Sequence, residues 1–109
     1  MGYKHTYFNQ HERNHIWRNI NSDEDVQMCI NGCLNALKIY EGVPIKNRIR
    51  EDKEGVERQL GELEIALERI DKFPKQFTFT QEDVKCLKEQ FLDFEEKLEQ
   101  LDMQRVSWD

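Results

Sequence analysis

Apolar residues recur at alternating spacings of three and four in two runs along the second half of the chain. The first run comprises Val56, Leu60, Leu63, Leu67 and Ile70. The second run comprises Val84, Leu87, Phe91, Phe94, Leu98 and Leu101. This spacing places each run on one face of an α-helix, and Pro74 between the runs ends the first helix. The pattern therefore predicts two long helices that pack as an antiparallel, coiled-coil-like hairpin.

Capping residues and a third apolar run predict two helices upstream of the hairpin. Asn9 and Glu12 form a capping-box sequence that starts a short helix within an aromatic N-terminal arm, residues 1–21. Ser22 is an N-cap residue for a second helix over residues 23–40. The apolar face of this second helix comprises Val26, Ile30, Cys33, Leu37 and Tyr40.

The two helices of the hairpin are expected over residues 44–72 and 80–104. Pro44 suits the first turn of a helix, where no N–H group is needed, and Thr80 is an N-cap residue. Polar residues and Gly55 interrupt the apolar face of the first long helix, so we expect a kink or a change of register near that glycine. The sequence predicts one all-α domain over residues 1–109, a small helical bundle built on this hairpin.

Charge is distributed unevenly along this chain of 109 residues, whose net charge is −6. Residues 1–50 have a net charge of +2, whereas residues 51–102 have a net charge of −8. Nucleic-acid binders need basic surfaces that displace counterions, so an acidic hairpin argues against direct contact with DNA or RNA.

Membrane insertion and export are not expected from this sequence. No apolar run approaches the ~20 residues that cross a bilayer, and the polar, aromatic N-terminus does not resemble a signal peptide. Three cysteines without regular spacing are typical of reduced thiols rather than disulfides. We therefore expect a cytoplasmic protein.

The sequence His11-Glu12-Arg13-Asn14-His15 matches the H-E-x-x-H pattern of zinc proteases. In that pattern two histidines on one helical face bind the metal and the glutamate activates water. Polar residues surround the motif here, and a chain of this length has no room for a substrate cleft. Nucleotide-binding loops and nucleophile motifs are absent too, so we expect neither an enzyme nor a cofactor.

A structural zinc site is an alternative use of the same histidines. Cys29 and Cys33 are also spaced by four residues, so His11, His15 and the two thiols could form a closed Cys₂His₂ set. The spacing between the two pairs is unlike that of zinc fingers, and Cys33 already belongs to an apolar face. Core packing is the favoured interpretation of the cysteines.

Three basic residues, Lys46, Arg48 and Arg50, lie at the expected start of the first long helix. Cations near a helix N-terminus can bind an anion, so an oligomer could collect a phosphorylated small ligand there. Ordinary surface charge that balances the acidic hairpin is the alternative.

Two surfaces are candidates for binding another protein. The aromatic arm offers Tyr7, Phe8 and Trp17, because aromatic side chains are favoured at interface hot spots. The last helix offers four acidic residues that lie off its apolar face, namely Glu89, Asp93, Glu96 and Glu99.

The composition favours a non-catalytic protein-interaction module, either an adaptor or a small inhibitor. Small acidic helical proteins without catalytic motifs are frequent among phage and mobile-element products that block host enzymes; such a protein would act in the host cytoplasm. An acidic face could also imitate a phosphate backbone in a basic groove. Self-association is expected as well, because one upstream helix cannot cover both flanks of a hairpin ~40 Å long.

Overall fold

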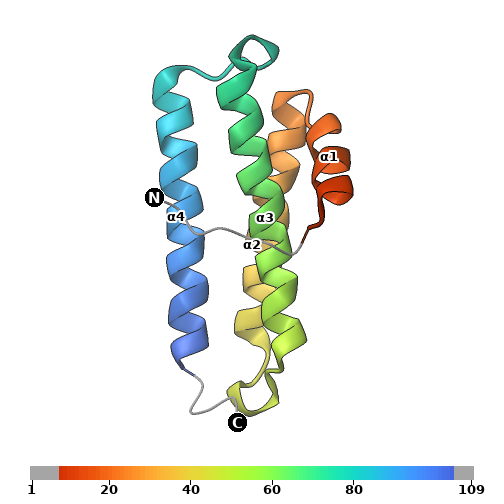
Figure 1. The fold of residues 1–109 in the computed structure, drawn as a ribbon. Helices are drawn as coiled ribbons and strands as arrows, with labels where there is room; N and C mark the ends of the chain where they lie inside the picture. The colour runs from red at the N-terminus through yellow and green to blue at the C-terminus, as the bar shows by residue number, and fades with distance from the viewer. Residues whose placement is uncertain (1–7, 105–109) are drawn as a thin grey trace.

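Four α-helices form where the sequence combines a capping residue with spaced apolar positions, and they confirm the predicted all-α bundle (Figure 1). The computed structural model describes residues 8–104. The α-helices are α1 (Gln10–Arg18), α2 (Asp23–Gly42), α3 (Arg50–Lys72) and α4 (Gln81–Met103). Two short 3₁₀ helices, η1 (Ile45–Asn47) and η2 (Pro74–Gln76), lie in the connections before and after α3.

The three predicted N-caps are confirmed, and each makes a complete capping box. Asn9, Ser22 and Thr80 each accept a hydrogen bond from the main-chain nitrogen three residues later. In each box the residue that donates this bond also accepts one from the cap nitrogen through its own carboxylate. These reciprocal bonds satisfy N–H groups that a helix start would otherwise leave unpaired.

α3 is the central helix of the bundle, because α1, α2 and α4 all pack against it (Figure 1). Successive helices run in opposite directions, and α1 lies beside only one half of α3. α2 packs against α3 more extensively than α4 does. The predicted hairpin of α3 and α4 is therefore present, but the closest helix pair in the bundle is α2 with α3.

The apolar faces that the sequence predicts form one hydrophobic core. Every position of the α2 and α3 runs is buried, and on α4 only Val84 and Leu87, near its start, are partly exposed. Additional buried residues on α3, including Ile65 and Ala66, extend its contact beyond a single stripe. A helix that is apolar on more than one side suits the centre of a bundle.

The expected helix over residues 44–72 begins later than predicted. Residues 45–47 form η1, and α3 begins only at Arg50, after extended main chain at Arg48 and Ile49. Helical hydrogen bonding then continues through Gly55 to Lys72, so the interruption precedes α3 instead of falling near the glycine.

The polar faces of the helices point to solvent. Within residues 8–104, no helix combines the length and the apolar composition needed to cross a membrane.

The connection between α3 and α4 is tied to the start of α2, because the Thr78 nitrogen donates to the Asp23 carboxylate at 3.0 Å and the Thr78 hydroxyl donates to it as well.

Two leucines make a matched test of this core. Leu63 on α3 is 1% exposed, whereas Leu92 on α4 is 49% exposed. We expect Leu63→Ala to lower the free energy of unfolding by about 2–5 kcal/mol, because it leaves a cavity in a packed core. Leu92→Ala should lower it by less than ~1 kcal/mol. Urea denaturation measures both, and equal losses would contradict the central position of α3.

Candidate functional site

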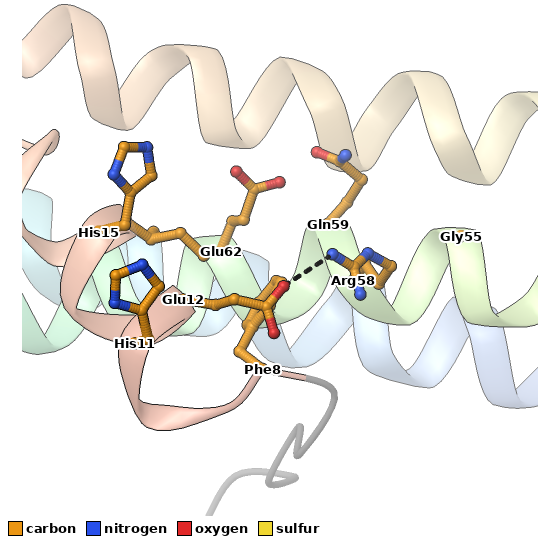
Figure 2. A pocket seen from close by; sticks show the side chains of 9 residues that line it. Phe8, His11, Glu12, His15, Gly55, Arg58, Gln59 and Glu62 are labelled. Atoms are coloured by element: carbon orange, nitrogen blue, oxygen red, sulfur yellow. Dashed lines mark ion pairs between the residues drawn. The ribbon is translucent and has the colours of Figure 1, made fainter.

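α1 carries the H-E-x-x-H sequence from His11 to His15, and the glutamate of this sequence makes a hydrogen bond and an ion pair within the chain. The Glu12 nitrogen donates to the Asn9 side chain at 2.8 Å, and the Glu12 carboxylate accepts from the Asn9 nitrogen at 3.2 Å. The second carboxylate oxygen lies 3.7 Å from the Arg58 guanidinium on α3 (Figure 2). Glu12 therefore caps α1 and links it to α3, which leaves it poorly placed to activate a water molecule.

A groove of about 620 Å³ lies between α1 and α3 beside this sequence (Figure 2). Its lining residues are Phe8, His11, Glu12, His15, Ile16, Gly55, Arg58, Gln59 and Glu62. Both imidazoles project from α1, and the Glu62 and Gln59 side chains project from α3. Within residues 8–104, however, no three His, Cys, Asp or Glu side chains come together in a way that could hold a metal ion.

The alternative zinc set of two histidines and two cysteines is not assembled. His11 and His15 are exposed, and the His15 main-chain oxygen accepts a hydrogen bond from the Asn19 amide at 2.8 Å. Cys33 lies in the core, where its thiol donates to the main-chain oxygen of Gln59 at 3.3 Å. Core packing, the favoured interpretation, accounts for this position.

Both α2 thiols stay protonated at neutral pH. Burial raises the pKa of Cys33 to about 12, and the nearby Cys29 and Glu62 act in the same direction. Burial, followed by Glu62 and Asp25, raises the pKa of Cys29 to about 12. Nucleophilic attack requires the thiolate, so these cysteines are poor nucleophiles at neutral pH.

Glu62 is the polar residue of the groove that its surroundings perturb most clearly. Burial raises the pKa of its carboxyl above the ordinary value of 4.5, and the Arg58 guanidinium partly opposes this rise. The charged form is therefore less favourable in the folded chain than in the unfolded chain. Ionisation of Glu62 lowers stability at neutral pH, and this loss disappears below the ordinary pKa, where both states are protonated.

Replacing Glu62 by glutamine tests this assignment. We expect Glu62→Gln to raise the melting temperature at pH 7, because the neutral amide avoids the cost of burying a charge. The gain should shrink as pH falls and vanish below pH ~4. Thermal melts across this pH range measure it. Glu99→Gln, at an exposed position of α4 that forms no ion pair with a described residue, serves as the control. A Glu62→Gln gain that did not change with pH would contradict the interpretation.

The candidate anion site at Lys46, Arg48 and Arg50 is wrong in one decisive respect, because Arg48 points into the protein. Its side chain is only 7% exposed and lies over the Tyr40 ring at 5.0 Å. Lys46 and Arg50 remain exposed on either side. The three cations therefore do not converge on a common ligand.

The Arg48 guanidinium holds the ends of two helices together. It donates to the main-chain oxygens of Glu41 at 3.2 Å and Val43 at 3.0 Å, at the end of α2. It also donates to Leu101 oxygen at 2.9 Å and to the Gln104 side chain at 3.3 Å, at the end of α4. The last carbonyl groups of a helix lack partners within the helix and carry partial negative charge, which a buried cation stabilises.

Arg48→Lys should lower the free energy of unfolding by about 2–4 kcal/mol, since an ammonium group cannot reach all of these acceptors at once. Arg50→Lys makes the same chemical change at an exposed neighbour and should alter stability by less than ~0.5 kcal/mol. Guanidinium chloride denaturation compares the two. Similar losses of stability in both variants would contradict the buried, hydrogen-bonded position of Arg48.

The described aromatic residues of the N-terminal arm contact their own chain. Phe8 is buried beneath the Arg58 guanidinium, which lies 4.9 Å from its ring centre. Trp17 is half-buried, makes an edge contact with Phe73 at 6.2 Å, and has Arg69 over its ring at 5.0 Å. The Tyr7 candidate lies outside the described residues. Phe8 and Trp17 thus dock α1 on the bundle, and their contacts leave little of either ring for a partner.

The acidic candidates on α4 are all exposed, as predicted. Glu89, Asp93, Glu96 and Glu99 make no ion pair with a described residue. Two lysines of α4 point elsewhere: Lys88 pairs with Asp71 on α3, and Lys97 pairs with Glu41 on α2. The third lysine, Lys85, is exposed four residues before Glu89 on the same side of the helix. The outward surface of α4, which we call the α4 acidic face, therefore has an excess of negative charge, with four carboxylates and one lysine.

Two features of the structure were not predicted from the sequence. The inward position of Arg48 has no signal in local sequence, because it depends on two helix ends meeting in space. The exposed apolar residues of α2, Met28, Leu34 and Ile39, do have a signal, because all three lie off the apolar face that the sequence defines. They mark a surface that the core does not use.

Known proteins offer no further guide to these sites. Comparison with protein-family models, with curated proteins and with solved structures gives no match in any of the three. The surface chemistry of the chain is therefore the basis for assigning a function.

Proposed function

We propose that this protein is a non-catalytic interaction module, an adaptor or a small inhibitor, that binds a basic surface of another protein through the α4 acidic face. The observation that carries the proposal is that Glu89, Asp93, Glu96 and Glu99 are exposed along one helix and form no ion pair with residues 8–104. Exposed charge of one sign steers association with a surface of the opposite sign and favours it over other partners.

The shape of α4 also suits a partner groove. The helix has 23 residues, which corresponds to a rod about 35 Å long. Leu92, half exposed among the acids, offers an apolar contact within the charged surface. A partner with a basic groove and an apolar pocket would bury both, and such a groove is also what nucleic-acid enzymes use to hold a phosphate backbone.

A catalytic role has less support from the geometry. Glu12 is held by the capping box and by Arg58, and the α2 thiols are protonated. In the basic turn considered for a phosphorylated ligand, Arg48 is buried and does not face a ligand together with Lys46 and Arg50. Three free thiols, one of them exposed, are compatible with action in the cytoplasm, or in the host cytoplasm if the chain is viral.

The test begins with capture of a partner from the native cell extract and its identification by mass spectrometry. Affinity of the purified pair is then measured against salt for the parent chain and for Glu89→Lys/Glu96→Lys. We expect affinity of the parent chain to fall steeply with salt, and the double reversal to weaken association at least tenfold at low salt, since charged surfaces within a Debye length then repel.

A matched control is Glu51→Lys/Glu54→Lys, which changes net charge equally on α3 at two residues that form no ion pair with a described residue. It should weaken association much less, because its charges lie on another helix. Affinity that ignored both salt and the α4 reversals would exclude the α4 acidic face as the binding surface. Equal losses in both double variants would mean that only the net charge matters.

A further inference from the structure

A largely exposed row of residues follows the side of α2 that points away from the core, and the Gln59 side chain of α3 covers part of it at Gly32. Met28 is 69% exposed and Ile39 is 64% exposed, more than any other large apolar side chain of α2. Gly32 and Asn35 lie between them, so the spacings are four, three and four residues. Residues at these spacings share one helical face. We call Met28, Gly32, Asn35 and Ile39 the α2 row.

A hollow of about 400 Å³ lies beside the α2 row, between α2 and the first turns of α3. Gly55 and Gln59 line both this hollow and the groove beside α1, so the hollow continues along α3 from the N-terminal end of α1. α1 has only nine residues and covers one half of the bundle (Figure 1). The other half of this face stays open.

Gly55 gives an independent reason to expect a close neighbour at this hollow. A glycine in a helix interior costs about 1 kcal/mol relative to alanine. A Cβ atom placed on Gly55 would meet nothing within 4 Å, so packing inside the chain does not require glycine here. Close approach of another main chain is a common reason for a glycine at such a position.

The α2 row is complementary to itself under twofold symmetry. A twofold axis between Cys33 and Leu34 makes a second α2 antiparallel to the first and places Met28 of one copy opposite Ile39 of the other. Gly32 then lies opposite Asn35 near the axis. The Gln59 side chain of α3 lies against one side of Gly32, so a second helix would approach the centre of the row over Asn35 and the open side of Gly32. The large apolar residues at the two ends then face each other, which is the self-matching that an isologous dimer requires.

Charge favours the same antiparallel arrangement. α2 begins with Asp23, Glu24 and Asp25, and its other end is followed by the exposed residues Lys46 and Arg50. Neither of these two cations forms an ion pair with a described residue. An antiparallel pair brings the acidic start of each α2 toward the basic turn of the other copy, whereas a parallel pair would bring acid toward acid.

We propose that the α2 row is a homodimer interface, with a second copy of this chain packed antiparallel across it. This goes beyond the proposed function, because it assigns a different surface and a different partner. It places Met28 and Ile39 in apolar contact between copies and gives Lys46 and Arg50 their acidic neighbours, Glu24 foremost because it is exposed at the start of α2.

Sedimentation equilibrium of the full chain over a wide concentration range tests the proposal. We expect a mass that approaches twice the 13.2 kDa of one chain at the upper end. Ile39→Glu should return the protein to the monomer mass, because it buries two charges between copies. Leu92→Glu, the same change at an exposed position of α4, should leave the dimer intact. Circular dichroism establishes that both variants are folded, and Met28→Glu repeats the test at the other end of the row.

Charge reversal tests the antiparallel orientation. Glu24→Lys and Lys46→Glu should each raise the dimer dissociation constant about tenfold, since each replaces two attractions by two repulsions. The double variant Glu24→Lys/Lys46→Glu should restore the parent value. A monomer mass at all concentrations, a dimer that survives Ile39→Glu, or a dimer lost in Leu92→Glu instead would each overturn the proposal.

Discussion

Burial of α3 is the constraint on which the rest of this fold depends. The helix carries apolar residues on more than one side, and α1, α2 and α4 all pack against it. A single partner helix cannot bury all of these apolar faces, because one helix covers only one stripe of its neighbour. The chain therefore places α3 in the middle of its sequence and folds its neighbours around it in alternating directions. This arrangement leaves α2 and α4 with outward surfaces that the core does not need.

The second constraint is the pairing of the helix ends by Arg48. It arises because the alternating directions of the helices bring the C-terminal ends of α2 and α4 together. α2 and α4 end on the same side of the bundle, so their unpaired carbonyl groups and negative helix ends lie close together (Figure 1). The guanidinium supplies several donors in a fixed plane and one positive charge to both ends. Its buried position also explains the break before α3. The extended main chain at Arg48 and Ile49 turns this side chain inward, and a continuous helix from Pro44 would commit residue 48 to helical geometry.

The sequence was a good guide wherever structure is decided locally. Capping boxes at Asn9 and Ser22 and the spaced apolar runs predict the helices, because their hydrogen bonds and faces depend on residues three or four apart. It was a poor guide where distant segments meet. Arg48 resembles Lys46 and Arg50 in sequence, yet only the meeting of two helix ends distinguishes it. Trp17 likewise looks available for a partner until Arg69 and Phe73, more than fifty residues later, are seen to cover it.

The distribution of charge connects the two proposed surfaces. A chain with a net charge of −6 repels its own copies, so a self-interface is least unfavourable where acidic residues are few. α2 has four acidic residues and one lysine, a net charge of −3, whereas α4 has eight acidic residues and three lysines, a net charge of −5. Self-association through α2 would leave the α4 acidic face of each copy open to solvent. A dimer of this kind would present two acidic faces, and a partner with two basic sites would bind it more tightly than either face alone, provided that the spacing of the sites allows both contacts.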